Sequence, residues 1–327
     1  MKTNITVIGD LIVDIYLDLP EMPKPEATII PRKIEMHVGG NGNFIVVASR
    51  LGLSVKVVDC IGNDSYGEYI RKVLLSEGVD MHNLIIRDGE TRVCLVLIHN
   101  GLKSFIALFS RNTVVLEPDI IEEDMIEGEA IYISGYTLAN VLGRQEDCAV
   151  YKAVEIAHKK GMNILFDASP LVSYIQHDLL LKVLKLTNIL FLNVDELRKM
   201  TGVNSIYSAL EKLKNKVGGI IVVKRGDKGA IVYDNGIVIR AKAIKCHTVD
   251  PTGAGDAFNA AFTYGYLKGV SLRETLKLAN IVGGLATEKF GGGENLPSKQ
   301  EIINFLKQYD QKLLAALTLL SKDLLDL

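Results

Sequence analysis

The segment Val249–Phe258 carries residue types that can bind an anion and move a proton. The small residues Gly253, Ala254 and Gly255 precede a helical pattern, so that backbone N–H groups at a helix N-terminus can face an anion. Asp256 follows directly, and its carboxylate can accept a proton from an attacking hydroxyl. A glycine-rich turn in which Asp256 is an ordinary N-cap residue is the alternative interpretation. For these residues alone the two are about equally good.

Further polar residues stand at the ends of apolar segments. Asp14 and Asn43 are suited to hold hydroxyl groups by hydrogen bonds, although a turn carboxylate and a helix cap would look the same. Asn193 and Glu196 follow the apolar segment Ile189–Leu192, and ligands gather at the carboxyl ends of strands in open α/β sheets. Their spacing also fits a capping box at a helix start.

Two glycines and one asparagine extend the list of candidates. Gly226 and Gly229 bend the chain between two predicted strands and would let the backbone approach a ligand closely, although a plain hairpin turn explains them equally well. Asn280 lies on a predicted helix among apolar residues and is a weaker candidate for the same site.

The elements that must position these residues alternate between strands and helices. Near-continuous apolar runs predict parallel strands that are buried on both faces, and amphipathic segments between them predict covering helices. The alternation predicts an α/β three-layer sandwich with a mostly parallel central sheet, and a largely helical chain after Ala254. The predicted strands are Ile5–Ile8, Val55–Cys60, Ile131–Ile133, Ile164–Phe166, Ile189–Leu192 and Ile220–Val223. Examples of the predicted helices are Tyr66–Glu77, Glu146–Lys160 and Ser205–Lys214.

Two stretches depart from this alternation and predict a small separate β-sheet. Ala27–His37 is extended in character, and Thr91–Phe109 reads as two strands joined at His99-Asn100-Gly101, a favoured hairpin turn. A second hairpin is predicted at Asp234-Asn235-Gly236. We expect one domain over residues 1–327, with a lid formed by residues 12–37 and 91–110.

Composition narrows the classes of function. The chain has 327 residues, 48% of them hydrophobic, with a formal net charge of −2 and no basic block for a nucleic acid backbone. It has neither a signal-peptide core nor an apolar run long enough for a membrane span. The four cysteines form no CxxC pair and read as free thiols. We expect a cytoplasmic protein that acts on small molecules.

The motifs together resemble the ribokinase-like (PfkB) family of sugar and nucleoside kinases. Each match is weak to moderate alone, but their shared order is highly specific and spans residues 5–293. The matching segments are Gly9–Asp14, Gly39–Asn43, Arg50–Gly52, Gly62–Gly67, Asn193–Glu196, Lys224–Gly229 and Val249–Phe258.

The resemblance implies roles for individual residues and two cofactors, ATP and Mg²⁺. Asp256 would be the general base and Gly253–Gly255 the anion hole. Glu196 would organise the waters of Mg²⁺, and Asp250 is a candidate ligand of a monovalent cation such as K⁺. The residues implied to bind the substrate are Asp10, Asp14, Gly39, Gly40 and Asn43. Those implied to bind ATP are Asn193, Lys224, Gly226, Gly229 and Asn280.

Departures from the family pattern concern the substrate more than the base. Only Asn41 and Gly42 separate Gly40 from Asn43, one residue fewer than in the family. Asp167–Pro170 lacks the Asn and Arg that many members carry, and Pro251 replaces the commoner Thr. A sugar is therefore the first expectation for the substrate and a nucleoside the second. If the substrate is a nucleoside, Tyr16, Phe105 and Phe109 are candidates for contact with its nucleobase.

Other classes of function explain less. A dinucleotide fingerprint at Gly40-Asn41-Gly42 has Ile45 in place of its third glycine, and no P-loop sequence occurs. A relative that binds sugar without turnover would usually have lost Asp256 or its glycine-rich loop, and both are present.

The lid is also expected to form a homodimer. Val93–Ile98 runs without a polar residue, so both faces of this strand are apolar and one of them needs a cover. A second copy of the lid is the simplest cover. The alternative is that this face packs against the chain's own helices, for example the leucine-rich tail Leu313–Leu325.

Overall fold

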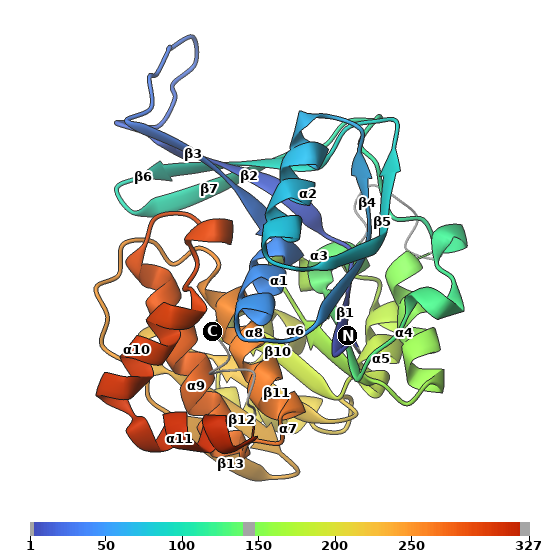
Figure 1. Ribbon diagram of the computed structural model, residues 1–327, viewed down its shortest axis with the longest axis vertical. Helices are drawn as coiled ribbons and strands as arrows, with labels where there is room; N and C mark the ends of the chain where they lie inside the picture. Colours follow the sequence, from blue (N-terminus) through green and yellow to red (C-terminus); the bar gives the residue numbers. More distant parts are fainter. Residues whose placement is uncertain (1–2, 140–147, 321–327) are drawn as a thin grey trace.

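A computed structural model describes residues 3–139 and 148–320, and a nine-stranded sheet forms its centre (Figure 1). The strand order is β13-β12-β11-β10-β9-β8-β1-β4-β5. Every pair from β11 to β5 is parallel, and β12 and β13 are added antiparallel. The strands are β1 (Ile5–Ile8), β4 (Val55–Gly62), β5 (Asp80–Arg87), β8 (Ala130–Ser134), β9 (Asn163–Asp167), β10 (Ile189–Asn193), β11 (Ile220–Lys224), β12 (Ala230–Asp234) and β13 (Ile237–Ala241).

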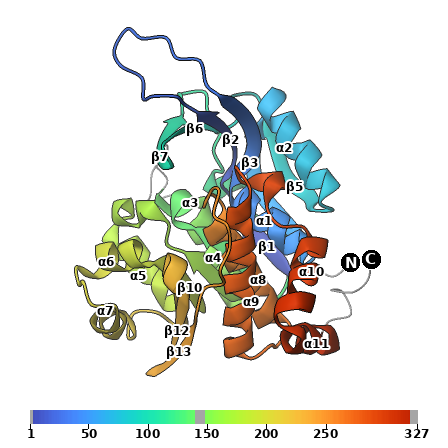
Figure 2. The same ribbon diagram turned by 90° about the vertical axis from the view of Figure 1, so that its left-hand side faces the viewer.

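Helices cover both faces of this sheet, which confirms the predicted three-layer sandwich. Neighbouring residues of one strand point into different cores: Val7 packs with α1 and α8, whereas Ile8 packs with α4 and α5. Figure 2 shows α8–α11 on the opposite side of the sheet from α5–α7. The helices are α1 (Asn41–Arg50), α2 (Ser65–Ser76), α3 (Gly135–Ala139), α4 (Ala149–Lys159), α5 (His177–Leu186), α6 (Val194–Thr201), α7 (Ile206–Leu213), α8 (Ala254–Leu267), α9 (Leu272–Leu285), α10 (Lys299–Tyr309) and α11 (Gln311–Leu320). Of the predicted helix Glu146–Lys160, the first two residues lie outside the described residues.

A separate four-stranded sheet has the order β3-β2-β6-β7. It comprises β2 (Leu11–Asp18), β3 (Lys33–Gly40), β6 (Val93–His99) and β7 (Leu102–Leu108). The predicted turn between β6 and β7 is present, with φ of 50° at Asn100 and 74° at Gly101. The second predicted hairpin joins β12 to β13. Within the extended stretch Ala27–His37, strand pairing begins only at Lys33, after Pro31, which lacks the backbone N–H that a ladder needs.

The two faces of the small sheet differ. Its inner face faces the rest of the protein and buries Ile12, Tyr16, Cys94, Val96 and Ile98. Its outer face exposes apolar side chains of the two edge strands: Ile34, Met36, Leu102, Ile106 and Leu108.

The C-terminal helix does not cover that outer face. Leu313 and Leu317 of α11 are buried in the core beside α10, far from the small sheet in Figure 1. The alternative cover from the leucine-rich tail is therefore wrong for the described part of the tail. Within residues 3–139 and 148–320, no helix combines the length and apolarity that crossing a membrane requires.

Candidate active site

Asp256 lies in the first turn of α8. The N-cap of this helix is Gly253, which has a left-handed φ of 73° and makes no side-chain cap hydrogen bond. Asp256 is the third helical residue and its carboxylate does not cap the helix, so the N-cap interpretation is wrong. The helix therefore starts directly after Gly253 without a side-chain N-cap, as an anion site requires.

Asn43 contacts the Asp256 carboxylate directly. Its Nδ2 lies 3.1 Å from Oδ2 of Asp256, and its Oδ1 accepts a hydrogen bond of 2.7 Å from the backbone N–H of Gly293. Asn43 belongs to the first turn of α1, so the two glycine-rich motifs of the sequence meet at this bond.

A buried polar network lies beside Asp256 and includes residues that the sequence analysis did not single out. The Lys224 ammonium lies 3.2 Å from Oδ1 of Asp167 and 3.2 Å from Oδ1 of Asn259. Asn259 also donates to Asp167 and to the hydroxyl of Tyr132. Asp167 is the last residue of β9, so the argument that singled out Asn193 at the end of β10 would also have found it.

Burial raises the pKa of Asp256 to about 7. This value includes a smaller increase from the negative charge of Asp167 and decreases from Lys224 and the Asn43 amide. A carboxylate with a pKa near neutrality can accept a proton at physiological pH and release it afterwards.

The glycine pair at the end of β3 leaves room for two carboxylates. A Cβ on Gly39 would lie 2.2 Å from Oδ2 of Asp14, and one on Gly40 would lie 2.8 Å from Oδ2 of Asp10. Burial raises the pKa of Asp14 to about 7 and that of Asp10 to about 6. The five residues predicted to bind a substrate, including Asn43, thus occupy adjoining parts of the β1–β2 turn, β2, β3 and α1.

Tyr16 lies between Asp14 and Asn43, the residue that contacts the proposed general base Asp256. Its hydroxyl donates to Asp14 over 3.3 Å, and a Cβ on Gly292 would lie 3.1 Å from the same hydroxyl and 2.6 Å from Oδ1 of Asn43. Asp14, Tyr16, Asn43 and Asp256 therefore follow one another around a single site.

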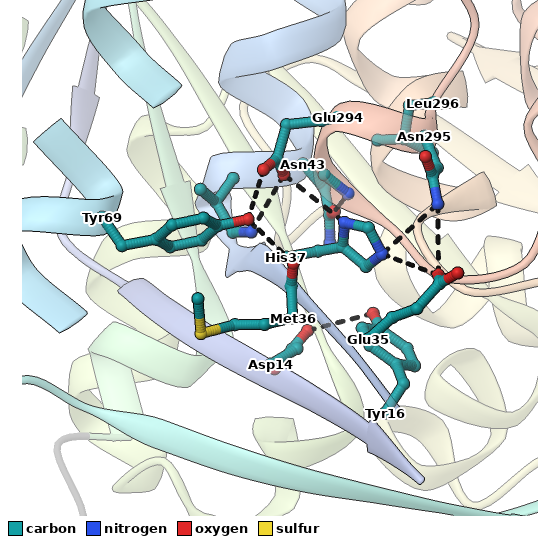
Figure 3. A network of polar contacts seen from close by, with 12 residues as sticks. Asp14, Tyr16, Glu35, Met36, His37, Asn43, Tyr69, Glu294, Asn295 and Leu296 are labelled. Atoms are coloured by element: carbon teal, nitrogen blue, oxygen red, sulfur yellow. Dashed lines mark hydrogen bonds and ion pairs between the residues drawn. The ribbon is translucent and has the colours of Figure 1, made fainter. Parts of the chain in front are cut away.

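A cluster around His37 holds the small sheet against the main body (Figure 3). Nε2 of His37 lies 2.9 Å from Glu35, and Nδ1 lies 3.6 Å from Glu294. Tyr69 of α2 donates to Glu294, and Asn295 donates to Glu35. Burial alone would lower the pKa of His37, but the two carboxylates raise it above its ordinary value.

The residues predicted to bind a nucleotide line one pocket, with the exception of Asn193. The pocket has a volume of about 1010 Å³ and includes Lys224, Gly226, Gly229 and Asn280. Gly226 has open space around its missing Cβ, whereas a Cβ on Gly229 would lie 2.1 Å from the carbonyl oxygen of Ala241. Gly229 is thus required by the hairpin, and Gly226 is free for close approach of a ligand. Asn280 is buried and donates to Ala241.

Asn193 and Glu196 form the capping box that their spacing allowed. Oε2 of Glu196 accepts from the Asn193 backbone over 2.7 Å, and Oε1 accepts from its Nδ2 over 2.8 Å. Glu196 is buried, and burial together with the Asp167 charge raises its pKa. Within the described ranges, no group of three His, Cys, Asp or Glu side chains could hold a metal by itself. Glu196 and Asp167 are both buried and interact electrostatically. This pair of carboxylates fits a Mg²⁺ ion that arrives with phosphates and keeps most of its waters.

Asp250 is buried beside the anion loop. Its Oδ1 accepts from the backbone and the hydroxyl of Thr252, each over 2.8 Å, and its Oδ2 accepts from the N–H of Gly291 over 3.0 Å. Lys103 of β7 also donates to Oδ1.

The chain is similar to known kinases over nearly its whole length. The chain is 25% identical to the ribokinase of Haemophilus influenzae over 94% of its own length and 99% of the relative's. It is 27% identical to a nucleoside kinase of Methanothermobacter thermautotrophicus, over 92% and 94% of the two chains. A solved structure from E. coli, of a protein proposed to be ribokinase II in complex with ATP and Mg²⁺, superposes with a TM-score of 0.81 at 25% identity, covering 94% of this chain and all of that one.

Membership in a family follows from a match to the sequence pattern that the members of that family share. The pattern of the pfkB family of carbohydrate kinases matches residues 2–299. The chain therefore belongs to the pfkB family of carbohydrate kinases and is a phosphotransferase with the ribokinase-like fold.

Proposed function

We propose that this protein transfers the γ-phosphoryl group of ATP to a hydroxyl of a small, uncharged sugar, with Asp256 as the general base. The observation that carries the proposal is the position of Asp256, a carboxylate with a pKa of about 7 in the first turn of α8, directly after Gly253–Gly255.

In this mechanism the side of the site that binds the substrate and the side that binds the nucleotide have separate tasks. Asp256 takes the proton of the substrate hydroxyl, and Asn43 holds the carboxylate by its bond to Oδ2. The backbone N–H groups of Gly253, Ala254 and Gly255 receive the negative charge of the transferring group. Lys224, which stays protonated between Asp167 and Asn259, adds a positive charge on the nucleotide side.

ATP would lie in the pocket between Lys224 and Asn280, with Gly226 close to it. Mg²⁺ supplies charge neutralisation of the phosphates when it is bound, and Glu196 with Asp167 would hold its water molecules. The complex of the E. coli relative with ATP and Mg²⁺ supports this choice of phosphoryl donor.

The charges of the substrate half favour an uncharged sugar. Asp10 and Asp14 can accept hydrogen bonds from hydroxyls, and a carboxylate or phosphate on the substrate would be repelled by them. The nearby cations are already paired, Arg92 with Asp59 and Lys103 with Asp250.

A nucleoside is the second candidate. Phe105 of β7 points from the inner face of the small sheet and is 63% exposed, so its ring is available to stack on a base. The nucleoside kinase among the relatives supports this alternative.

The outer face of the small sheet supports a homodimer. It exposes Leu102, Ile106 and Leu108 on one edge strand and Ile34 on the other. Exposed apolar side chains on one face are typical of an interface, and a second copy would pair the same surface about a two-fold axis.

An assay of ADP release tests the function. The purified protein is incubated with ATP and Mg²⁺ and, one class at a time, with pentoses, hexoses, sugar phosphates, sugar acids and nucleosides. We expect the fastest turnover with an uncharged sugar. A preference for a sugar acid or a sugar phosphate would contradict the assignment of Asp10 and Asp14.

A further inference from the structure

A lysine of the small sheet reaches the loop that begins the anion site. Lys103 lies near the start of β7, paired with Ile98, and points from the inner face of the sheet. Its ammonium donates to Oδ1 of Asp250 and to the hydroxyl of Thr252. The Lys103 side chain is 13% exposed and that of Asp250 is 2% exposed, so the pair is almost entirely removed from water.

Asp250 needs a cation at this place. A buried carboxylate without a partner is costly, and a pair that loses one member leaves an uncompensated charge. Burial alone would raise the pKa of Asp250, but Lys103 and the N–H groups of Gly291 and Thr252 hold it below its ordinary value. The carboxylate is thus ionised and Lys103 supplies its counter-charge.

The Asp250 carboxylate joins the two loops that shape the catalytic site. Through Oδ1 it holds Thr252, the residue before Gly253. Through Oδ2 it holds Gly291. Gly293, two residues further on, donates to Asn43, which in turn contacts Asp256. A cation at Asp250 therefore supports both the anion loop and the amide that orients the base.

The resemblance to the family makes this carboxylate a candidate ligand for K⁺, and the donor set does not fit that ion here. A bound K⁺ needs several oxygen ligands, but the ammonium already contacts Oδ1 of Asp250 and Oγ1 of Thr252. A second cation at the same oxygens would lie directly beside the Lys103 ammonium and would be repelled by it.

We propose that the Lys103 ammonium is the permanent counter-ion of Asp250, so that the protein needs no monovalent metal ion. Because Lys103 belongs to β7, the small sheet contributes this charge to the loop that begins the anion site. The proposal builds on the proposed function, but it concerns a cation site that exists with or without turnover. Removing the ammonium should therefore create a site that K⁺ can fill.

The test is thermal unfolding at constant ionic strength, in KCl and in tetramethylammonium chloride, whose cation is too large for the site. Lys103→Ala removes the ammonium, and Lys24→Ala is the matched control, because Lys24 is an exposed lysine of the loop between β2 and β3. For the wild type and Lys24→Ala we expect the same Tm in both salts. For Lys103→Ala we expect a Tm lower by about 5 °C or more in tetramethylammonium chloride and a saturable recovery as K⁺ is added.

Two results would overturn the proposal. One is a K⁺-specific rise of Tm in the wild type; the other is a Lys103→Ala protein whose Tm is equal in both salts. If Lys103→Ala does not fold, Lys103→Gln, which keeps a donor without the charge, is compared in the same way. Neither readout uses a substrate, so a wrong substrate class leaves this test intact.

Turnover gives a second readout once a substrate is known. K⁺ should stimulate kcat of Lys103→Ala about tenfold or more, the usual effect of restoring a group that orients a site, and should change the wild type less than twofold. A folded Lys103→Ala protein that K⁺ leaves inactive would contradict the replacement of the ion by the ammonium.

Discussion

The side-chain amide of Asn43 lies 3.1 Å from the Asp256 carboxylate, and this bond joins two helix starts that are 213 residues apart in the chain. The amide donates to the charged form of the acid and so lowers the pKa that burial has raised. Asn43 is therefore a positioning residue as well as part of the substrate half of the site.

This bond predicts a shift in the dependence of rate on pH. Asp256 must be ionised to accept a proton, so kcat/KM of the wild type should fall as the pH drops through about 7, the raised pKa of this carboxyl. Asn43→Ala removes a donor that favours the ionised form, and its acid limb should move to higher pH. Asn295→Ala is the control, because Asn295 bonds Glu35 and not Asp256. If the acid limb of the pH profile of Asn43→Ala stays at the wild-type pH, Asn43 does not influence the pKa of Asp256.

Asp14 should control affinity for the sugar alone. Asp14→Asn keeps the shape of the side chain but loses one acceptor, and an unpaired hydroxyl costs about 1–3 kcal/mol. We expect KM for the sugar to rise about 5–150-fold and KM for ATP to stay within a factor of two or three. Asp18→Asn, on the same strand and paired with exposed Arg32, serves as the control. A larger effect on ATP would mean that the two halves of the site are reversed.

Glu196 should influence the metal as well as its helix. In Glu196→Gln one acceptor oxygen becomes a donor, which disturbs waters held around Mg²⁺, so half-maximal activity should need more Mg²⁺. Ser298 and Glu301 form a capping box at α10, and Glu301→Gln offers the matched control for helix capping alone. Equal Mg²⁺ titrations for wild type and both variants would leave Glu196 with a capping role only.

The outer face of the small sheet should hold a dimer together. Ile106→Asp with Leu108→Asp places two charges on that face, and sedimentation should show monomers where the wild type is a dimer. Both side chains are exposed, 45% and 46%, so the fold should tolerate the change. Phe105→Asp alters the opposite face of the same strand and should leave the dimer intact. A wild type that is monomeric at micromolar concentration rules the interface out.

The sequence was sufficient to predict the layered architecture and the candidate site residues that belong to short motifs. Apolar strands such as β10 must be covered on both faces, and small residues before a helix predict an anion site, so local patterns carried these conclusions. The strand β5 was missed because it lies at the edge of the sheet and its only apolar run, Leu84–Ile86, is short and follows the polar residues His82 and Asn83.

Contacts between distant elements could not be predicted in the same way. A lysine near a hairpin turn, such as Lys103, ordinarily faces water, and only the position of the small sheet brings it to Asp250. The capping interpretation of Asp256 failed because a left-handed glycine, Gly253, starts the helix instead. The network of Asp167, Lys224 and Asn259 likewise depends on β9, β11 and α8 meeting at one edge.

The most direct measurement for the whole account is the turnover of Asp256→Asn beside the wild type, in the ADP-release assay with the best substrate. Because the pKa of this buried acid is raised, its ionisation above pH 7 costs the native state stability, so the Asn variant should be at least as stable at pH 8. Its kcat should fall by about 10²–10⁴, while ATP binding measured by calorimetry stays near the wild-type value. A folded Asp256→Asn protein with near wild-type turnover would contradict the assignment of Asp256 as the base.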